Sequence, residues 1–195
     1  PQTEKLRQLL AEGAVGKVTV INSAFTFSIN NENDIRLDKA LAGGGLMDVG
    51  CYCVNITRLL TGEEPARVQA IARRGAASGV DETLAGVIEF PSGIIGHFDC
   101  GFRAFRTNYC DIRGTNGRIF VDPVFNLEPT QEGVVHVWRG DQYEKIPVAP
   151  VNQYTLMAED FADALLNNRP PRFPAQDGVN NMRALDLLYA AAGRA

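Results

Sequence analysis

The chain lacks the features by which membrane and nucleic-acid-binding proteins are usually recognised. No apolar run approaches the ~18 residues that cross a bilayer. The 19 Lys+Arg are outnumbered by 23 Asp+Glu, so the formal net charge is −4. The basic surface that attracts a phosphate backbone is therefore missing. We expect neither a membrane nor a nucleic acid as partner.

Patterns for metal sites and disulfides are also missing. The chain has four cysteines and two histidines. Cys51 and Cys53 stand two apart in a stretch predicted as helix, where their side chains point in different directions. His97 and His136 each stand alone in a strand-like run, so no zinc spacing can be assembled. We expect no metal and reduced thiols, as is typical of a cytoplasmic protein.

Both common phosphate-binding loops are absent. No Gly-x-Gly-x-x-Gly segment follows a buried strand, and no Gly-x-x-x-x-Gly-Lys-[Ser/Thr] segment occurs. Gly43-Gly44-Gly45 comes nearest, but Asp48 occupies the place of the third required glycine. The chain alone is therefore not expected to hold a dinucleotide in the usual way. Because it opens at Pro1 directly in an amphipathic pattern, we interpret it as a piece of a longer protein.

The sequence that is present predicts one globular α+β domain. Its 195 residues are 45% hydrophobic and 22% charged, which suffices for a single core. The expected helices are 3–12, 46–60, 153–167 and 178–193, with a helical turn near 37–41 in the polar loop 30–42. The expected strands are 17–28, 66–74, 82–90, 94–101, 107–113, 117–122, 133–138 and 142–148. Their short connections favour antiparallel pairing, so we expect a large open, mainly antiparallel sheet with helices packed on one face.

Three polar side chains share one face of the predicted helix 46–60. At 100° per residue, Tyr52 lies about 40° and Asn55 about 20° from Asp48 around the axis. A carboxylate, a phenol and an amide on a buried helix cost free energy if left unpaired. They either satisfy one another as a structural cluster or face a cleft, and the residue pattern alone leaves both possibilities open.

In a cleft, Tyr52 is a candidate for proton transfer. The ordinary pKa of tyrosine, about 10, is too high for efficient exchange at neutral pH, so its phenolate needs a nearby cation. Arg36, in the predicted loop, is the better local cation. The three glycines before the helix allow the backbone to approach a ligand closely.

The stretch GGGLMDVGCYCVN, residues 43–55, resembles the signature of the glucose–fructose oxidoreductase / inositol dehydrogenase / rhizopine catabolism family of NAD(P)-dependent oxidoreductases. Other segments resemble the family in the same order over essentially the whole chain. They are PQTEKLRQLLAEGAVGKV, NDIR, LTGEEP, GVDE and the final helix from Asp177-Gly178 to Leu188-Tyr189. Each segment alone is weak evidence for the family, whereas the occurrence of all of them in the family's order is specific to it.

The resemblance implies that residues 1–195 are a single C-terminal domain with the fold of dihydrodipicolinate-reductase-like C-terminal domains. The family's N-terminal Rossmann domain, which binds NAD or NADP, has no counterpart in this chain. Neither does the family's catalytic lysine, which lies in a Glu-Lys-Pro motif. Asp48 and Tyr52 match the family's second catalytic pair, an Asp followed four residues later by His or Tyr. The tyrosine form resembles the glucose–fructose oxidoreductase and dihydrodiol dehydrogenase branches.

The implied activity is hydride transfer between the nicotinamide and a sugar, polyol or dihydrodiol. Tyr52 would exchange the hydroxyl proton, with its pKa lowered by the lysine, and Asp48 would orient the substrate hydroxyl or that lysine. The remaining expected contacts are Arg36 and Asn55 for the substrate, and Gly44 and Gly45 for the cofactor.

A second hypothesis is a non-catalytic relative that senses a ligand or binds a partner protein with the same architecture. The Asp48–Tyr52 pair favours the enzyme, because a sensor needs no proton donor. The fragment alone is expected to be inactive. Since the exposed face of a large open sheet usually needs cover, we expect a homodimer or tetramer formed through the sheet.

Overall fold

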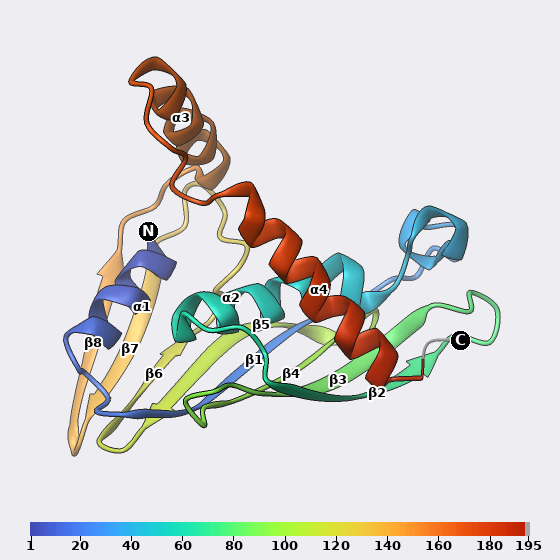
Figure 1. The fold of residues 1–195 in the computed structure, drawn as a ribbon, viewed down its shortest axis with the longest axis horizontal. Helices are drawn as coiled ribbons and strands as arrows, with labels where there is room; N and C mark the ends of the chain where they lie inside the picture. Colours follow the sequence, from blue (N-terminus) through green and yellow to red (C-terminus); the bar gives the residue numbers. More distant parts are fainter. Residues whose placement is uncertain (194–195) are drawn as a thin grey trace.

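The computed structural model describes residues 1–193, which form one eight-stranded sheet with α-helices above it (Figure 1). Residues 194–195, the end of the expected domain, lie outside the described range. The strands are β1 (Val18–Ser28), β2 (Arg67–Arg74), β3 (Asp81–Glu89), β4 (Ile95–Gly101), β5 (Arg103–Gly114), β6 (Gly117–Val121), β7 (Gly133–Arg139) and β8 (Gln142–Val148). The α-helices are α1 (Gln2–Ala11), α2 (Cys51–Thr61), α3 (Gln153–Leu166) and α4 (Ala175–Ala191).

The sheet order is β2-β3-β4-β1-β5-β6-β7-β8. Neighbouring strands pair antiparallel except β1 and β4, which are parallel at the centre. The predicted open and mainly antiparallel sheet is therefore confirmed. The parallel pair arises because β1 is joined to the following strands by a long segment that includes α2, which gives the chain room to return in the same direction.

Helices α1, α2 and α4 lie on one side of the sheet (Figure 1). Along β1, alternate residues point to this side, and Ile21 and Phe25 are buried there while Asn22 faces the other way. Two apolar clusters fill the space between helices and sheet, one under α2 and α4 and the other under α1. Among residues 1–193, no helix covers the opposite face of the sheet.

Helix α3 differs from the expected arrangement, because it stands clear of the sheet (Figure 1). Of its residues only Ala164 is buried. Its large apolar side chains are exposed at helical spacing, namely Tyr154, Met157, Phe161 and Leu165. The helix therefore presents an apolar stripe that nothing within the described chain covers.

The prediction of one α-helix over 46–60 is wrong in its first turn. Residues Leu46–Gly50 form a π-helical turn, η3, and the regular helix α2 begins at Cys51. A π turn holds more residues than an α turn and often accompanies functional sites. The expected helical turn near 37–41 is present as a short 3₁₀ helix, η2 (Lys39–Leu41), which follows η1 (Ile35–Leu37).

A buried arginine holds α4 against α2. The Arg58 side chain is 4% exposed, and it donates hydrogen bonds to both carboxylate oxygens of Glu64 at 2.8 and 2.7 Å. It also donates to Asp177 at 3.0 Å and to Asn181 at 3.2 Å, both on α4. A buried guanidinium is stable only with such partners, so this residue fixes the start of α4 beside α2.

We expect Arg58→Met to lower the free energy of unfolding by about 2 kcal/mol, because it removes the charge-assisted hydrogen bonds from the buried guanidinium to Glu64 and Asp177. The pKa of Glu64 is lowered, chiefly by its hydrogen bonds with Arg58. The loss is therefore fully present at neutral pH and shrinks as the pH falls through that lowered pKa. Urea unfolding at neutral and acidic pH measures both effects.

The matched control is Arg67→Met, which removes an exposed pair with Glu89. It should change the free energy of unfolding by less than about 1 kcal/mol. Equal losses at the two arginines would contradict the role given to Arg58.

Candidate active site

Tyr52 lies in the first turn of α2, where its ring packs against other aromatic rings and its hydroxyl is accessible. The ring meets Phe25 of β1 edge-on at 5.7 Å between centroids, and Phe125 at 5.7 Å. Phe25 and Phe125 stack on each other at 5.4 Å. The residue is 47% exposed, and no group among residues 1–193 hydrogen-bonds its hydroxyl. The phenol is thus placed by packing and left available to an external partner.

Asp48, in η3, is held by an arginine. Arg36 Nε donates to Asp48 Oδ2 at 3.0 Å, and Arg36 Nη1 donates to Asp34 at 3.3 Å. The negative charge of Asp48 is the main reason that the pKa of Arg36 is raised. With its side chain 31% exposed, Asp48 is a carboxylate with one oxygen fixed and access to solvent.

The expectation that Arg36 is the cation for Tyr52 is not met. Its guanidinium pairs with Asp48 and Asp34 instead, and it is not among the charges that shift the pKa of Tyr52. That pKa is raised, first by burial and then by Cys51, Tyr154 and Asp48. Within the described chain, the phenol therefore holds its proton more tightly than free tyrosine does.

Asn55 lies one turn after Tyr52 on the same helix. Its side-chain amide is 3.5 Å from Asp177 Oδ2, a long hydrogen bond to the residue that also binds Arg58. Asn55 is therefore linked to the contact between α2 and α4, and its role in binding substrate stays a prediction.

Gly44 and Gly45 are both buried by their own chain. Gly44 has φ +131°, and a Cβ there would collide with a carboxylate oxygen of Asp81. A Cβ on Gly45 would come within 3.0 Å of the Gly101 Cα. The close approach that the glycines were expected to allow is present, but its partners here are Asp81 and Gly101. Contact of these glycines with a cofactor stays a prediction.

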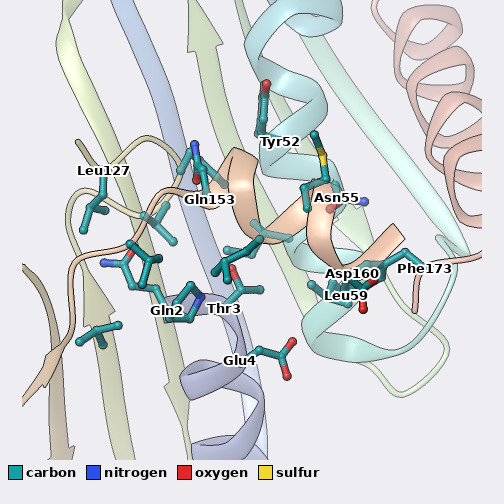
Figure 2. A pocket seen from close by; sticks show the side chains of 18 of the residues that line it. Gln2, Thr3, Glu4, Tyr52, Asn55, Leu59, Leu127, Gln153, Asp160 and Phe173 are labelled. Atoms are coloured by element: carbon teal, nitrogen blue, oxygen red, sulfur yellow. The ribbon is translucent and has the colours of Figure 1, made fainter. Parts of the chain in front are cut away.

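A cavity of about 540 Å³ lies beside Tyr52 and Asn55, between the start of α1, α2, α3 and the start of α4 (Figure 2). Most of its lining is apolar, including Ile56, Leu59, Phe125, Leu156, Met157 and Phe173. Figure 2 shows Tyr52 at the edge of the cavity, with its hydroxyl turned away from Gln2, Thr3 and Glu4. The cavity therefore adjoins the phenol without being centred on it.

Sequence reasoning missed three contributors to the site. Phe25 was signalled only by strand alternation, and Phe125 lies in a loop with no pattern of its own. Asp177 was noted as part of the final helix but not as a partner of Asn55.

Comparison with known proteins settles the family. A family model described as the GFO/IDH/MocA C-terminal domain matches residues 3–120. The chain belongs to the GFO/IDH/MocA family. This confirms the resemblance carried by residues 43–55 and the segments around them.

The relatives of this GFO/IDH/MocA chain are oxidoreductases. D-xylose 1-dehydrogenase (NADP(+)) 2 of Haloferax volcanii is 34% identical over 193 residues, 98% of this chain and 59% of that protein. Trans-1,2-dihydrobenzene-1,2-diol dehydrogenase of Bos taurus is 32% identical over 157 residues, 79% of this chain and 44% of that protein. The structure of KijD10, a 3-ketoreductase from Actinomadura kijaniata in complex with NADP and TDP-benzene, matches with a TM-score of 0.92 at 26% identity, covering 98% of this chain and 59% of that one. This chain spans less than two thirds of the length of each.

We expect Tyr52 of the 195-residue chain to ionise above the ordinary tyrosine pKa of about 10, because its partly buried ring disfavours the phenolate. Ultraviolet difference titration of the chain against its Tyr52→Phe variant isolates this one phenol. An ionisation below pH 10 would mean that a cation within the chain reaches Tyr52, contrary to the structure.

Proposed function

We propose that this chain is the substrate-binding and catalytic half of an NAD(P)-dependent oxidoreductase that transfers hydride to or from a sugar, polyol or dihydrodiol. The observation that carries the proposal is the Tyr52 hydroxyl, packed in place and unpartnered within residues 1–193, one turn from the Asp48 carboxylate. The family relatives, which by name act on xylose, dihydrodiols and a keto group, support this substrate class.

The residues of this chain supply the proton-transfer side of such a reaction. Tyr52 would give its proton to the substrate oxygen during reduction and take it back during oxidation. Asp48, with one oxygen fixed by Arg36, would accept a hydrogen bond from the substrate hydroxyl or from the lysine that the family resemblance implies. Because the pKa of Tyr52 is raised here, efficient exchange at neutral pH requires that additional cation.

The residues of this chain fit only part of a bound dinucleotide. This agrees with a protein in which a second domain holds the rest of the cofactor. When bound, the nicotinamide would supply or accept the hydride. The described chain supplies the Tyr52 phenol and the Asp48 carboxylate for proton transfer. Its glycines at 44 and 45, however, pack against Asp81 and Gly101 and do not form a phosphate-binding loop. We therefore place most cofactor contacts in a Rossmann domain outside this chain. For Gly44 and Gly45, cofactor contact remains what the family resemblance implies, and their packing against Asp81 and Gly101 does not support it.

The apolar stripe of α3 and the neighbouring cavity support this placement. Tyr154 and Met157 of the stripe are each 66% exposed, and Met157 also lines the cavity beside Tyr52. The relatives are longer than this chain by about two fifths of their length. We propose that the full protein has a corresponding additional domain, which covers α3 and closes the cavity. We also propose that the protein is cytoplasmic.

In the full-length protein, Tyr52→Phe should lower kcat by two orders of magnitude or more, because it removes the proton donor and leaves the ring packing intact. The Kd for the cofactor should barely change. Steady-state kinetics with NAD and NADP over a panel of sugars and diols measures the first quantity, and cofactor fluorescence titration measures the second.

Tyr143→Phe, on the distant strand β8, is the matched control and should leave kcat unaltered. An undiminished kcat in Tyr52→Phe would remove this residue from the mechanism, whereas a wild type without turnover would favour the non-catalytic alternative. The 195-residue chain alone should form no NAD(P)H.

We also propose that the open face of the sheet joins two copies of the protein. On this face Ile71 of β2 is 81% exposed and Val87 of β3 is 43% exposed. A hollow of about 670 Å³ lies beside them, with His97 and Asp99 in its lining. Exposed apolar side chains on a sheet with no covering layer are typical of an interface.

Ile71→Asp should convert the oligomer to a monomer, because it places an unpaired charge in the proposed interface. The Tm of the monomer itself should change little, since the side chain is exposed within one chain. Sedimentation velocity measures the assembly. Ala77→Asp, in the turn between β2 and β3, adds the same charge away from the face and should leave the oligomer intact. A monomeric wild type would contradict the proposed interface.

A further inference from the structure

A buried carboxylate holds the start of the segment that carries Asp48 and Tyr52. Asp81, the first residue of β3, is 5% exposed. Its Oδ2 accepts a hydrogen bond from the Leu46 backbone amide at 2.7 Å, and its Oδ1 accepts one from the Tyr189 hydroxyl of α4 at 3.3 Å. Leu46 is the first residue of η3, two residues before Asp48.

The π turn has no local cap, so Asp81 serves as a cap from a distance. The first amides of a helical segment lack partners inside it and need an acceptor. Gly45, at the cap position of η3, has no side chain to offer one. A carboxylate is well suited to this place, because its charge also interacts favourably with the helix dipole. The amide of Leu46 thereby acquires a buried, charge-assisted bond across the fold.

Gly44 makes this contact possible and links it to the other side of the site. Its lack of a Cβ leaves room for the Asp81 carboxylate. Its backbone amide donates to the Arg36 carbonyl at 3.0 Å, and its carbonyl accepts from the Asp48 amide at 3.0 Å. The same turn therefore binds the backbones of both members of the Asp48–Arg36 ion pair, and Asp81 anchors that turn to the sheet and to α4.

We propose that Asp81 is a positioning residue for the Asp48–Tyr52 pair: by holding the Leu46 amide, it fixes the π turn that aligns Asp48 with Arg36. The proposal rests on the proposed function for its effect on turnover, but its structural part stands without it. Loss of the Leu46 bond would let η3 relax toward a regular α turn, which rotates Asp48 relative to both Arg36 and Tyr52. Displacements of this kind, about 1 Å, are enough to slow a reaction by about a hundredfold.

The test compares Asp81→Ala with Asp81→Asn in the full-length protein. The alanine variant removes the acceptor, and we expect kcat to fall about 10- to 100-fold while the KM for substrate changes less than about threefold. The asparagine variant keeps an oxygen for the Leu46 amide, so kcat should stay within about threefold of the wild type. A purely structural role would not produce this rescue together with the split between kcat and KM.

Nuclear magnetic resonance of the same variants gives a readout that does not depend on turnover. The Arg36 Nε–H signal should be slowly exchanging in the wild type and in Asp81→Asn, and fast or absent in Asp81→Ala. Val135→Ala, a cavity in the apolar cluster under α1, controls for lost stability and should lower the Tm without altering the Arg36 signal or kcat.

The outcomes separate the two proposals. A wild-type protein without oxidoreductase turnover would overturn the proposed function, and the Arg36 signal would still decide the role of Asp81. An unchanged Arg36 signal in Asp81→Ala, or a kcat close to wild type in that variant when the wild type is active, would overturn the positioning role.

Discussion

The burial of η3 and α2 between the sheet and α4 is the constraint on which the rest of the site depends. Leu46, Cys53 and Val54 are fully buried along this segment, so it cannot rotate without exposing apolar surface. Polar anchors stand at both ends, with Asp81 at the beginning and Arg58 near the end. Because the apolar faces fix the rotation, the remaining stripe that carries Asp48, Tyr52 and Asn55 has one orientation relative to the sheet.

The regular elements could be predicted from the sequence because they follow from local signals. The strand alternation of 17–28 and the turn residues between later strands place the sheet within a few residues of the observed bounds. The start of β5 at Arg103, earlier than the predicted 107, depends on pairing with Ser28 of β1, which no local pattern contains. The π turn also depends on a distant contact, since the Leu46 amide bonds to Asp81 across 35 positions.

The candidate site was predictable in its residue types but not in its pairings. Helical spacing predicts that Asp48 and Tyr52 lie on one face, and the family resemblance selects them, although Asp48 lies in the π turn and not in the regular helix. Neither signal reveals that Arg36 pairs with Asp48 rather than with the Tyr52 phenol. Arg36 lies in a loop, and the position of a loop is set by tertiary contacts such as the hydrogen bond from the Gly44 amide to the Arg36 carbonyl. The exposure of the apolar stripe of α3 was likewise not predictable, since an amphipathic pattern does not show what covers the apolar face.

The pairings also bear on the two explanations that the sequence left open for the polar stripe. A structural cluster would join the carboxylate, the phenol and the amide to one another. Instead Asp48 binds Arg36, Asn55 turns to Asp177, and the Tyr52 hydroxyl has no partner among residues 1–193. The hydroxyl avoids the cost of an unmade bond only because Tyr52 is 47% exposed and water can reach it. If another domain excluded that water, the hydroxyl would need a new partner to avoid the free-energy cost of an unmade hydrogen bond. A substrate oxygen or a cation could be that partner. The geometry is therefore what the proposed function requires of one wall of a site that is completed from outside the chain.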